Sequence, residues 1–259
     1  MNNGERDELI IKLKLIELRD KKTSINIGNG LTAIESVGFN NVEYKRFPMG
    51  INLNDIIYKG DNAISLFVET LGITKAPARS KSDVTINGIG ISLKSMSSAP
   101  PAIVNHTPRT GFEIACNHST ANINELDNII LKYWELRKKG QIKEDVRNDN
   151  LLSPFKDQKN ALSPFINYFL FDGSGSGLSR HQASLILDYY DPIAPNKWKT
   201  YNRNDAVDLF WDRLVFSVRS KGMPESYPSI DATKFDSIKI WTEYFQKKYR
   251  GSLHIRTKD

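Results

Sequence analysis

Cysteine is almost missing from this chain of 259 residues, in which Cys116 is the only one. A single thiol excludes a disulfide within the chain and any zinc site built from several cysteines. Histidine is scarce as well, with four residues scattered along the sequence. We therefore expect a protein of a reducing compartment, the cytoplasm.

Long apolar runs are also lacking. No stretch approaches the ~20 residues that a helix needs to cross a bilayer. The N-terminal segment carries Glu5, Arg6, Asp7 and Glu8, which does not fit the layout of a signal peptide. We expect neither a membrane span nor export.

The composition is that of a globular protein with an excess of basic residues. Hydrophobic residues make up 39% and charged residues 25% of the chain, which is long enough for one large domain or two small ones. Lys and Arg number 36 against 30 Asp and Glu, for a net charge of +6. This charge suits a polyanionic partner such as nucleic acid but does not demand one.

The most informative stretch is a predicted hairpin over residues 82–95. Asn87-Gly88 is the dipeptide best suited to a two-residue turn, and alternating apolar residues flank it. This register places Asp83 opposite Ser92, with Lys94 on the same polar face. A structural interpretation is an amphipathic hairpin with a weak surface salt bridge. A functional one is a carboxylate, a hydroxyl and an amine gathered for chemistry.

Helical periodicity surrounds this hairpin. We predict a first helix from Glu5 to about Lys21, with an apolar face and its charges elsewhere. The linker is expected within the charged segment 141–150. Further predictions are helices over 61–71, 122–139 and 204–213, a helix-like stretch over 238–249, and strands over 112–116, 214–219 and 253–258.

Two C-terminal segments are candidates for DNA contact. The Gly-rich turn over 173–181 lacks the ending of a phosphate-binding P-loop, so it is either a flexible turn or a DNA-contacting turn. The last strand carries a basic face, which fits either a solubilising edge strand or a ribbon that approaches DNA. The residues concerned are Ser179, Arg180 and His181 in the turn, and His254, Arg256 and Lys258 in the strand.

The hairpin resembles the catalytic core of the PD-(D/E)XK nucleases, in which an Asp on one strand and an acid-x-Lys on the next serve a magnesium site. Asp83 matches the first acid and Lys94 the lysine. Ser92 stands where the family normally has Asp or Glu. The resemblance therefore implies that a carboxylate outside the hairpin completes the metal site.

Landmarks along the whole chain resemble the HpaII-type restriction endonucleases: Gly4-Glu5 on the first helix, G-I-S-L-K-S, Asn105 and Thr110-Gly-Phe, F-L-F-D-G, and a final L-H-I-R. The resemblance implies a Mg²⁺-dependent enzyme that cuts both strands of DNA at a short palindrome, with a cognate DNA methyltransferase as functional partner. It implies Glu5 as second acid, ahead of Glu8, Glu113 and Glu69, with the Leu93 carbonyl as a further ligand.

The expected fold is α/β, with a PD-(D/E)XK-like mixed central sheet flanked by helices and a C-terminal α+β region for DNA recognition. We place the catalytic core in 1–145 and the recognition region in 146–259. A homodimer is left open. The alternatives are a non-catalytic DNA-binding or assembly protein and a structure-specific repair or recombination nuclease. Residues expected at DNA also include Ser95, Ser97, Asn105 and Arg109.

Overall fold

The computed structural model describes residues 1–27, 30–95, 102–223 and 237–258. The chain forms two compact units, each built from two separate segments. Unit 1 comprises Met1–Pro101 and Arg180–Asn204, and unit 2 comprises Ala102–Ser179 and Asp205–Asp259. No helix within the described ranges is long and apolar enough to span a bilayer.

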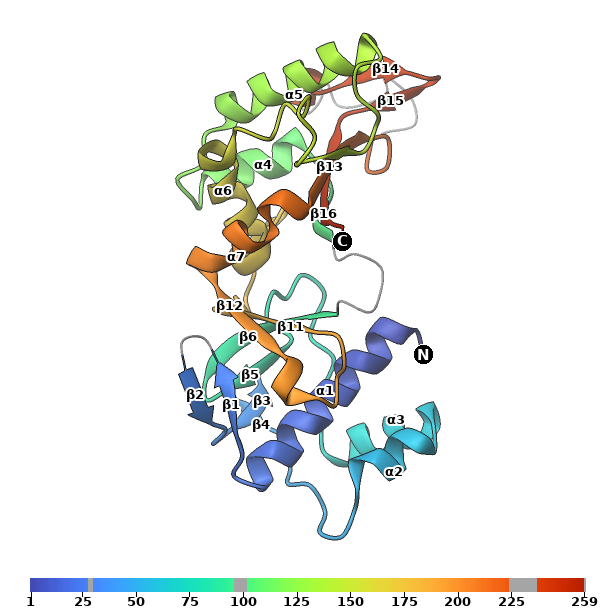
Figure 1. Ribbon diagram of the computed structural model, residues 1–259, viewed down its shortest axis with the longest axis vertical. Helices are drawn as coiled ribbons and strands as arrows, with labels where there is room; N and C mark the ends of the chain where they lie inside the picture. The colour runs from blue at the N-terminus through green and yellow to red at the C-terminus, as the bar shows by residue number, and fades with distance from the viewer. Residues whose placement is uncertain (28–29, 96–101, 224–236, 259) are drawn as a thin grey trace. The chain divides into compact units, whose positions relative to one another are not determined.

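Unit 1 is built on a six-stranded mixed sheet with the strand order β12-β11-β6-β5-β3-β4 (Figure 1). The β6/β11 pair is parallel and the other neighbours are antiparallel. A separate hairpin joins β1 (Ser24–Ile27) and β2 (Gly30–Ala33). The strands of the sheet are β3 (Val37–Phe39), β4 (Val42–Glu43), β5 (Val84–Ile86), β6 (Ile89–Ser95), β11 (Leu185–Tyr189) and β12 (Lys199–Asn202).

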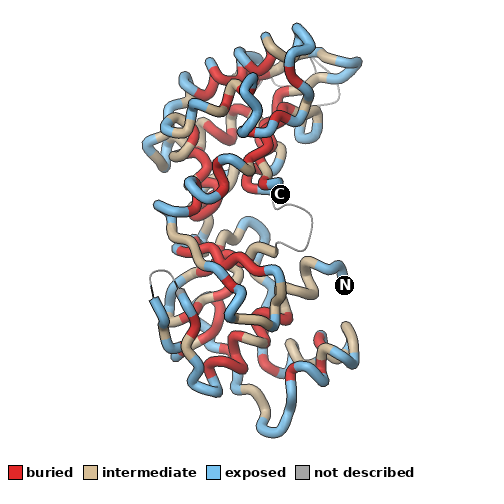
Figure 2. The backbone as a smooth tube through the Cα atoms, in the orientation of Figure 1, coloured by how far each residue is buried: buried red, intermediate tan, exposed pale blue. Residues whose placement is uncertain are grey.

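Helix α1 (Asn3–Asp20) is the central helix of unit 1. Asn2 caps it by accepting a hydrogen bond from the Glu5 amide at 2.9 Å. Its apolar side chains share one core cluster with those of the sheet. Figure 2 marks the buried positions along the backbone. The helix is buried on more sides than its apolar stripe predicts, and Lys12, Glu17 and Arg19 are also buried. Three short helices complete the unit: α2 (Leu53–Tyr58), α3 (Asp61–Thr70) and the 3-10 turn Pro195–Lys197.

Unit 2 combines an antiparallel sheet, with the order β7-β16-β13-β8, and a set of helices. Phe112 lies at the centre of its aromatic core, with its ring against those of Phe165 and Trp241. The strands are β7 (Ala102–Pro108), β8 (Val146–Arg147), β13 (Leu214–Arg219) and β16 (Ser252–Thr257), with the hairpins β9 (Gly173–Ser174) to β10 (Gly177–Leu178) and β14 (Glu243–Phe245) to β15 (Lys248–Arg250). The helices are α4 (Arg109–Cys116), α5 (Ile123–Lys138), α6 (Lys159–Asn167), the π-helical turn Tyr168–Asp172, α7 (Arg203–Phe210) and the 3-10 turn Trp211–Arg213.

The division into units differs from the boundary at residue 145 that we expected. β11 follows residue 180, yet it pairs with β6 and so completes the sheet of unit 1. The charged segment 141–150 is no linker, because Val146 in β8 pairs with Phe216 of β13 within unit 2. Strand pairing between distant segments therefore decides the units, and local composition does not reveal it.

Most regular elements agree with their periodicity. α1, α3, α5, β13 and β16 lie within one or two residues of their predicted bounds. Two predictions are wrong. Residues 112–116 form part of α4 rather than a strand, and the stretch 238–249 contains β14 and the start of β15 rather than a long helix. The three residues Phe112, Ile114 and Cys116 alternate over too short a run to distinguish the two structures.

Candidate functional site

The β5-β6 hairpin has the register that the sequence predicts. Val84 lies opposite Ile91, and the two-residue turn has positive φ at both Asn87 (51°) and Gly88 (78°). The Asn87 side chain also accepts the Ser36 amide at 3.1 Å, which ties the turn to the segment before β3. The hairpin is thus fixed at its turn, and its open end carries the polar residues.

Asp83 lies at that open end, one residue before β5. Its amide donates to the Ile91 carbonyl at 2.9 Å, although Val84 is the partner of Ile91 in the strand register. Its Oδ2 accepts the Leu93 amide at 2.7 Å and the Ser92 hydroxyl at 3.4 Å. The Asp83 carboxylate therefore accepts a backbone N–H that a carbonyl of the neighbouring strand would accept in a regular ladder. Ser92 is beside Asp83 as predicted, and it donates its hydroxyl to Asp83.

Burial dominates the electrostatics of Asp83. Desolvation raises the pKa of this carboxyl, and the positive charge of Lys94 acts in the opposite direction. Glu8 adds a negative charge that also raises the pKa, while the Leu93 amide and Lys12 lower it. Asp83 is thus a desolvated carboxylate within the field of one acid and two amines. A cation bound there would offset its desolvation.

The acid whose charge raises the pKa of Asp83 is Glu8 and not the expected Glu5. Glu5 instead forms an exposed ion pair with Lys75, with 2.7 Å between Oε1 and Nζ. The Lys75 hydrogen bond and charge lower the pKa of Glu5. Glu8 lies one turn further along α1 and pairs with Lys12 at 2.7 Å. Both acids face a cavity of about 310 Å³, whose lining is Met1, Glu5, Glu8, Leu9, Val68, Ile73 and Lys75.

Strand β11 brings a further carboxylate that the sequence analysis missed. Asp188 is the register partner of Lys94 in the parallel β6/β11 pair, and it is 7% exposed. Side chains of directly paired residues lie on the same face of a sheet. One residue further, Tyr189 pairs with Ser95, and burial followed by the charge of Asp7 raises the pKa of its hydroxyl. No local signal could have linked β11 to β6, because about 90 residues separate them.

The donors gathered here suit a hard cation. Mg²⁺ binds in proteins through one or two carboxylates and fills its shell with water and phosphate oxygens. Asp83 and Glu8 supply such oxygens. Within the described ranges, no group of three or more His, Cys, Asp or Glu side chains has the geometry of a metal site. A magnesium ion held by Asp83 and Glu8 would need water and substrate oxygens to complete its shell.

Glu113, the reserve ligand, belongs to a structural network in unit 2. Its Oε1 accepts Arg109, and its Oε2 accepts the Ser237 hydroxyl at 2.6 Å. Arg109 is 7% exposed and also forms a two-pronged ion pair with Asp127, both contacts at 2.8 Å. The Trp241 indole donates to the same Asp127 at 2.7 Å. The guanidinium N–H groups of Arg109 already donate to Asp127 and Glu113 within the unit. Arg109 is therefore not free to contact a base, contrary to our expectation.

The predicted basic face of β16 is largely engaged as well. His254 is 9% exposed and stacks on His106 with ring centroids 4.4 Å apart. Arg256 forms an ion pair with Asp145 at 2.8 Å. Lys258 is exposed and lies one residue beyond the end of the strand. β16 has β13 on one side and β7 on the other, so it is not the edge strand that the solubilising interpretation of its basic face required.

The remaining predicted contact residues differ in exposure. Asn105 and Arg180 are exposed, whereas His181 is half-buried with its ring 4.8 Å from that of Phe39. The Ser179 amide donates to the Asp172 carbonyl at 2.8 Å. Ser97 lies outside the described residues.

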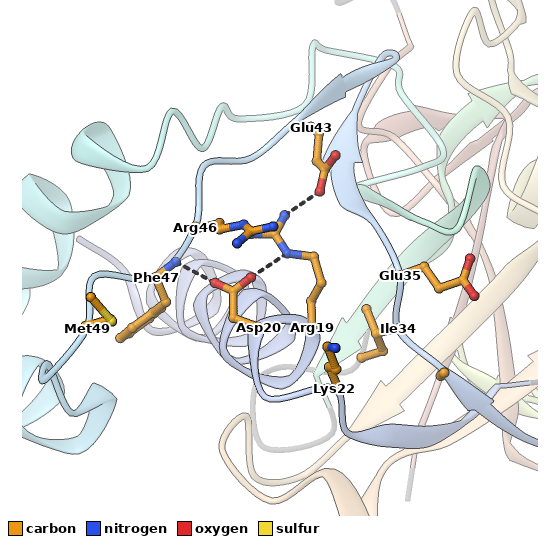
Figure 3. A pocket seen from close by; sticks show the side chains of 10 residues that line it. Arg19, Asp20, Lys22, Ile34, Glu35, Glu43, Arg46, Phe47 and Met49 are labelled. Atoms are coloured by element: carbon orange, nitrogen blue, oxygen red, sulfur yellow. Dashed lines mark hydrogen bonds and ion pairs between the residues drawn. The ribbon is translucent and has the colours of Figure 1, made fainter.

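A larger cavity of about 550 Å³ lies at the C-terminal end of α1 (Figure 3). Arg19 forms its inner wall, with hydrogen bonds to Asp20 (2.9 Å), Glu43 (2.9 Å) and two backbone carbonyls. Cations at a helix C-terminus also complement the helix dipole. The charged groups here therefore have a structural explanation, and the hairpin end stays the candidate site.

No family model, no curated protein and no solved structure matches this chain.

Proposed function

We propose that this chain is a type II restriction endonuclease, a Mg²⁺-dependent enzyme that cuts both strands of DNA at a short palindrome. The observation that carries the proposal is the open end of the β5-β6 hairpin. There, a desolvated Asp83 accepts the Leu93 amide, one residue before Lys94, and α1 contributes Glu8. The mixed sheet flanked by helices is compatible with a PD-(D/E)XK nuclease core.

Each residue has a role in this proposal. Bound Mg²⁺ would supply a Lewis acid for the phosphate and a water of lowered pKa. Asp83 and Glu8 would hold the ion, with the Leu93 carbonyl as a further ligand. Lys94 makes no ion pair with another described residue, so its amine is available to orient the attacking water and to stabilise charge on the phosphate. Ser92 keeps Asp83 in place through its hydroxyl.

We propose that the DNA contacts come from exposed polar residues that have no evident structural role. Arg180, Asn105 and Lys258 are the first of these. The net charge of +6 favours association with the phosphate backbone. A cognate methyltransferase that protects host DNA and a cytoplasmic location belong to the same proposal.

The decisive experiment is digestion of a plasmid of known sequence, followed by mapping of the cut ends. We expect discrete fragments with Mg²⁺ and none with EDTA. Lys94→Ala should abolish cleavage and leave DNA binding in Ca²⁺ largely intact, because the amine acts on the reaction and not on the fold. Wild-type cleavage rates in Lys94→Ala would contradict this assignment. In the wild-type digest, branch-specific cutting or general degradation would favour a repair or recombination nuclease.

One observation favours the non-catalytic alternative. Among the described residues, no group of three or more His, Cys, Asp or Glu side chains has the geometry of a metal site. A DNA-binding protein would need none. Site-specific retention of DNA without Mg²⁺-dependent cutting would support that function.

A further inference from the structure

Arg79 occupies a backbone conformation that arginine rarely adopts. It is the third residue of a turn that the Ser80 amide closes by donating to the Pro77 carbonyl at 3.0 Å. Of the two central residues only Arg79 has positive φ, 69°, as in a type II turn, where this position favours glycine. Strain of this kind is often found at functional sites. Because glycine would fill the position without strain, the turn alone does not explain the arginine side chain.

The segment that carries Arg79 lies against a second segment, which carries Arg180. The Lys81 and Ser82 amides both donate to the His181 carbonyl at 2.9 Å. Arg79 precedes the first of these donors by two residues, and Arg180 directly precedes the acceptor. The two arginines are therefore attached to the same part of unit 1, although they are far apart in the sequence.

Both segments cross the polar face of the β5-β6 hairpin at Gly90. A Cβ atom added there would lie 2.5 Å from the Gln182 carbonyl and 3.2 Å from the Ser82 Cβ, so the two segments leave no room for a side chain. Positions 90, 92 and 94 share one face of β6, because side chains alternate along a strand. At ~3.3 Å per residue, Gly90 lies about 13 Å from Lys94 along β6. The two segments thus lie on the face that carries the candidate site.

Neither arginine has a protein partner for its charge in the described structure. Arg79 and Arg180 are exposed, and no hydrogen bond or ion pair joins either guanidinium to another described residue. Arg109 in unit 2 shows the opposite case, because its guanidinium contacts two carboxylates. A guanidinium matches the geometry of phosphate oxygens. Two such groups on the face of Lys94 therefore suit a ligand with successive phosphates.

We propose that Arg79 and Arg180 contact neighbouring phosphates of the DNA backbone and so hold the duplex across the face of Lys94. This inference rests on the proposed function for the identity of the ligand. Each strand of a duplex carries one phosphate per ~3.4 Å of helix axis, so DNA bound at Lys94 has further phosphates at the distance of Gly90. Phosphate contacts fix the position of the duplex and are independent of its sequence.

The test measures DNA binding without cleavage. Fluorescence anisotropy of a labelled duplex in Ca²⁺ is recorded at several NaCl concentrations for the wild type, Arg79→Gly and Arg180→Ala. We expect each variant to bind about fivefold to tenfold more weakly at low salt. The slope of log affinity against log salt should decrease in magnitude by about 0.9, the value for one phosphate contact. An unchanged slope in either variant would overturn the proposal.

Sequence dependence distinguishes a phosphate contact from a base contact. The loss of affinity in each variant should be equal for two duplexes of unrelated sequence, because the phosphate backbone is the same in both. A loss confined to one of the two duplexes would mean that the arginine reads a base, which contradicts the proposal.

Arg79→Gly also separates the charge of the side chain from the conformation of the turn. Glycine adopts positive φ without strain, so the urea midpoint of this variant should equal or exceed that of the wild type while its DNA affinity falls. Arg79→Lys keeps both the charge and the strain, and it should keep the wild-type salt slope. An equal loss of slope in Arg79→Lys and Arg79→Gly would assign position 79 to the turn and overturn its contact with phosphate.

Lys59→Ala is the matched control. Lys59 is an exposed cation of the same unit at the end of α2, and no ion pair joins its amine to another described residue. Its DNA affinity should stay within about twofold of wild type, since salt screens charges that make no direct contact. A loss equal to that of Arg79→Gly would mean that any cation of unit 1 has this effect, which contradicts a specific role for the two arginines.

The binding measurements and the cleavage assay can fail separately. If both arginine variants lose slope and the wild type cuts no DNA, the phosphate contacts stand and the nuclease function fails. If the wild type gives discrete fragments with Mg²⁺ and both variants keep the wild-type slope, the nuclease function stands and the phosphate contacts fail.

Discussion

Each unit contains a cluster of partly buried charged side chains, and the two clusters differ in how completely they are paired. In unit 2, both oxygens of Asp127 and both of Glu113 accept hydrogen bonds, from Arg109, Trp241 and Ser237. In unit 1, the contacts of Asp83 both go to Oδ2, and Lys94 has no ion-pair partner among the described residues. The first cluster is closed and the second is open.

This difference separates structure from function better than residue type does. Arg109 and Glu113 are the kinds of residue that bind DNA and metal. In the closed network, however, their polar groups are already hydrogen-bonded to other side chains of unit 2. The open cluster keeps a desolvated carboxylate, whose two hydrogen bonds both fall on one oxygen, and a half-buried amine. Perturbed groups of this kind concentrate at functional sites.

The largest expected effect breaks the closed cluster. Arg109→Leu should lower the free energy of unfolding of unit 2 by about 3–5 kcal/mol, because it leaves Asp127 buried without its cation. Urea denaturation followed by tryptophan fluorescence reports this, since Trp134, Trp211 and Trp241 lie in unit 2. Lys258→Leu, at an exposed position of the same unit, should change the value by less than about 0.5 kcal/mol. A similar loss in both variants would contradict the closed network.

The next effect tests the open cluster. Glu8→Gln keeps the shape of the side chain but removes its charge, and should reduce cleavage by about 100-fold, the scale of losing one charged group at the reacting centre. Glu5→Gln removes an acid whose partner is the exposed Lys75, and should stay within about threefold of wild type. Both rates are measured on the same plasmid. The opposite order would return the role of second acid to Glu5.

A smaller effect concerns the acid stability of unit 2. Burial, the neighbouring His106 and then Arg219 lower the pKa of His254 to about 4, below its ordinary value of 6.5. The unfolded chain therefore binds a proton more readily than the folded one between these values. Stability should fall as the pH decreases from about 6.5 towards 4.

His254→Phe tests this origin, because it keeps a ring against His106 and removes the titrating group. The urea midpoint of this variant should fall less over the same pH range than that of the wild type. Some slope will persist, since burial also lowers the pKa of His106, as do the charges of Lys221 and Arg219. If the urea midpoint of the variant falls as steeply with decreasing pH as that of the wild type, the effect comes from other groups.

The sequence by itself determined the local structure of this protein. Asn87-Gly88 fixes the turn and therefore the register of the hairpin, since both residues adopt positive φ readily. The apolar spacing predicted α1, α3 and α5. Asp83 and Ser92 meet because that register leaves little choice. These features depend on residues close together in the chain, and propensity and alternation describe them well.

Only the tertiary structure decided which charges work together. β11 joins β6 from about 90 residues away and places Asp188 beside Lys94. α1 is buried on most sides, so Lys12 is buried and pairs with Glu8. The ion pair between Arg109 and Asp127 likewise forms only in the folded unit. The physical reason is common to all three, because the energy of a charge depends on its burial and its partners, and both are set by segments that meet only when the chain folds.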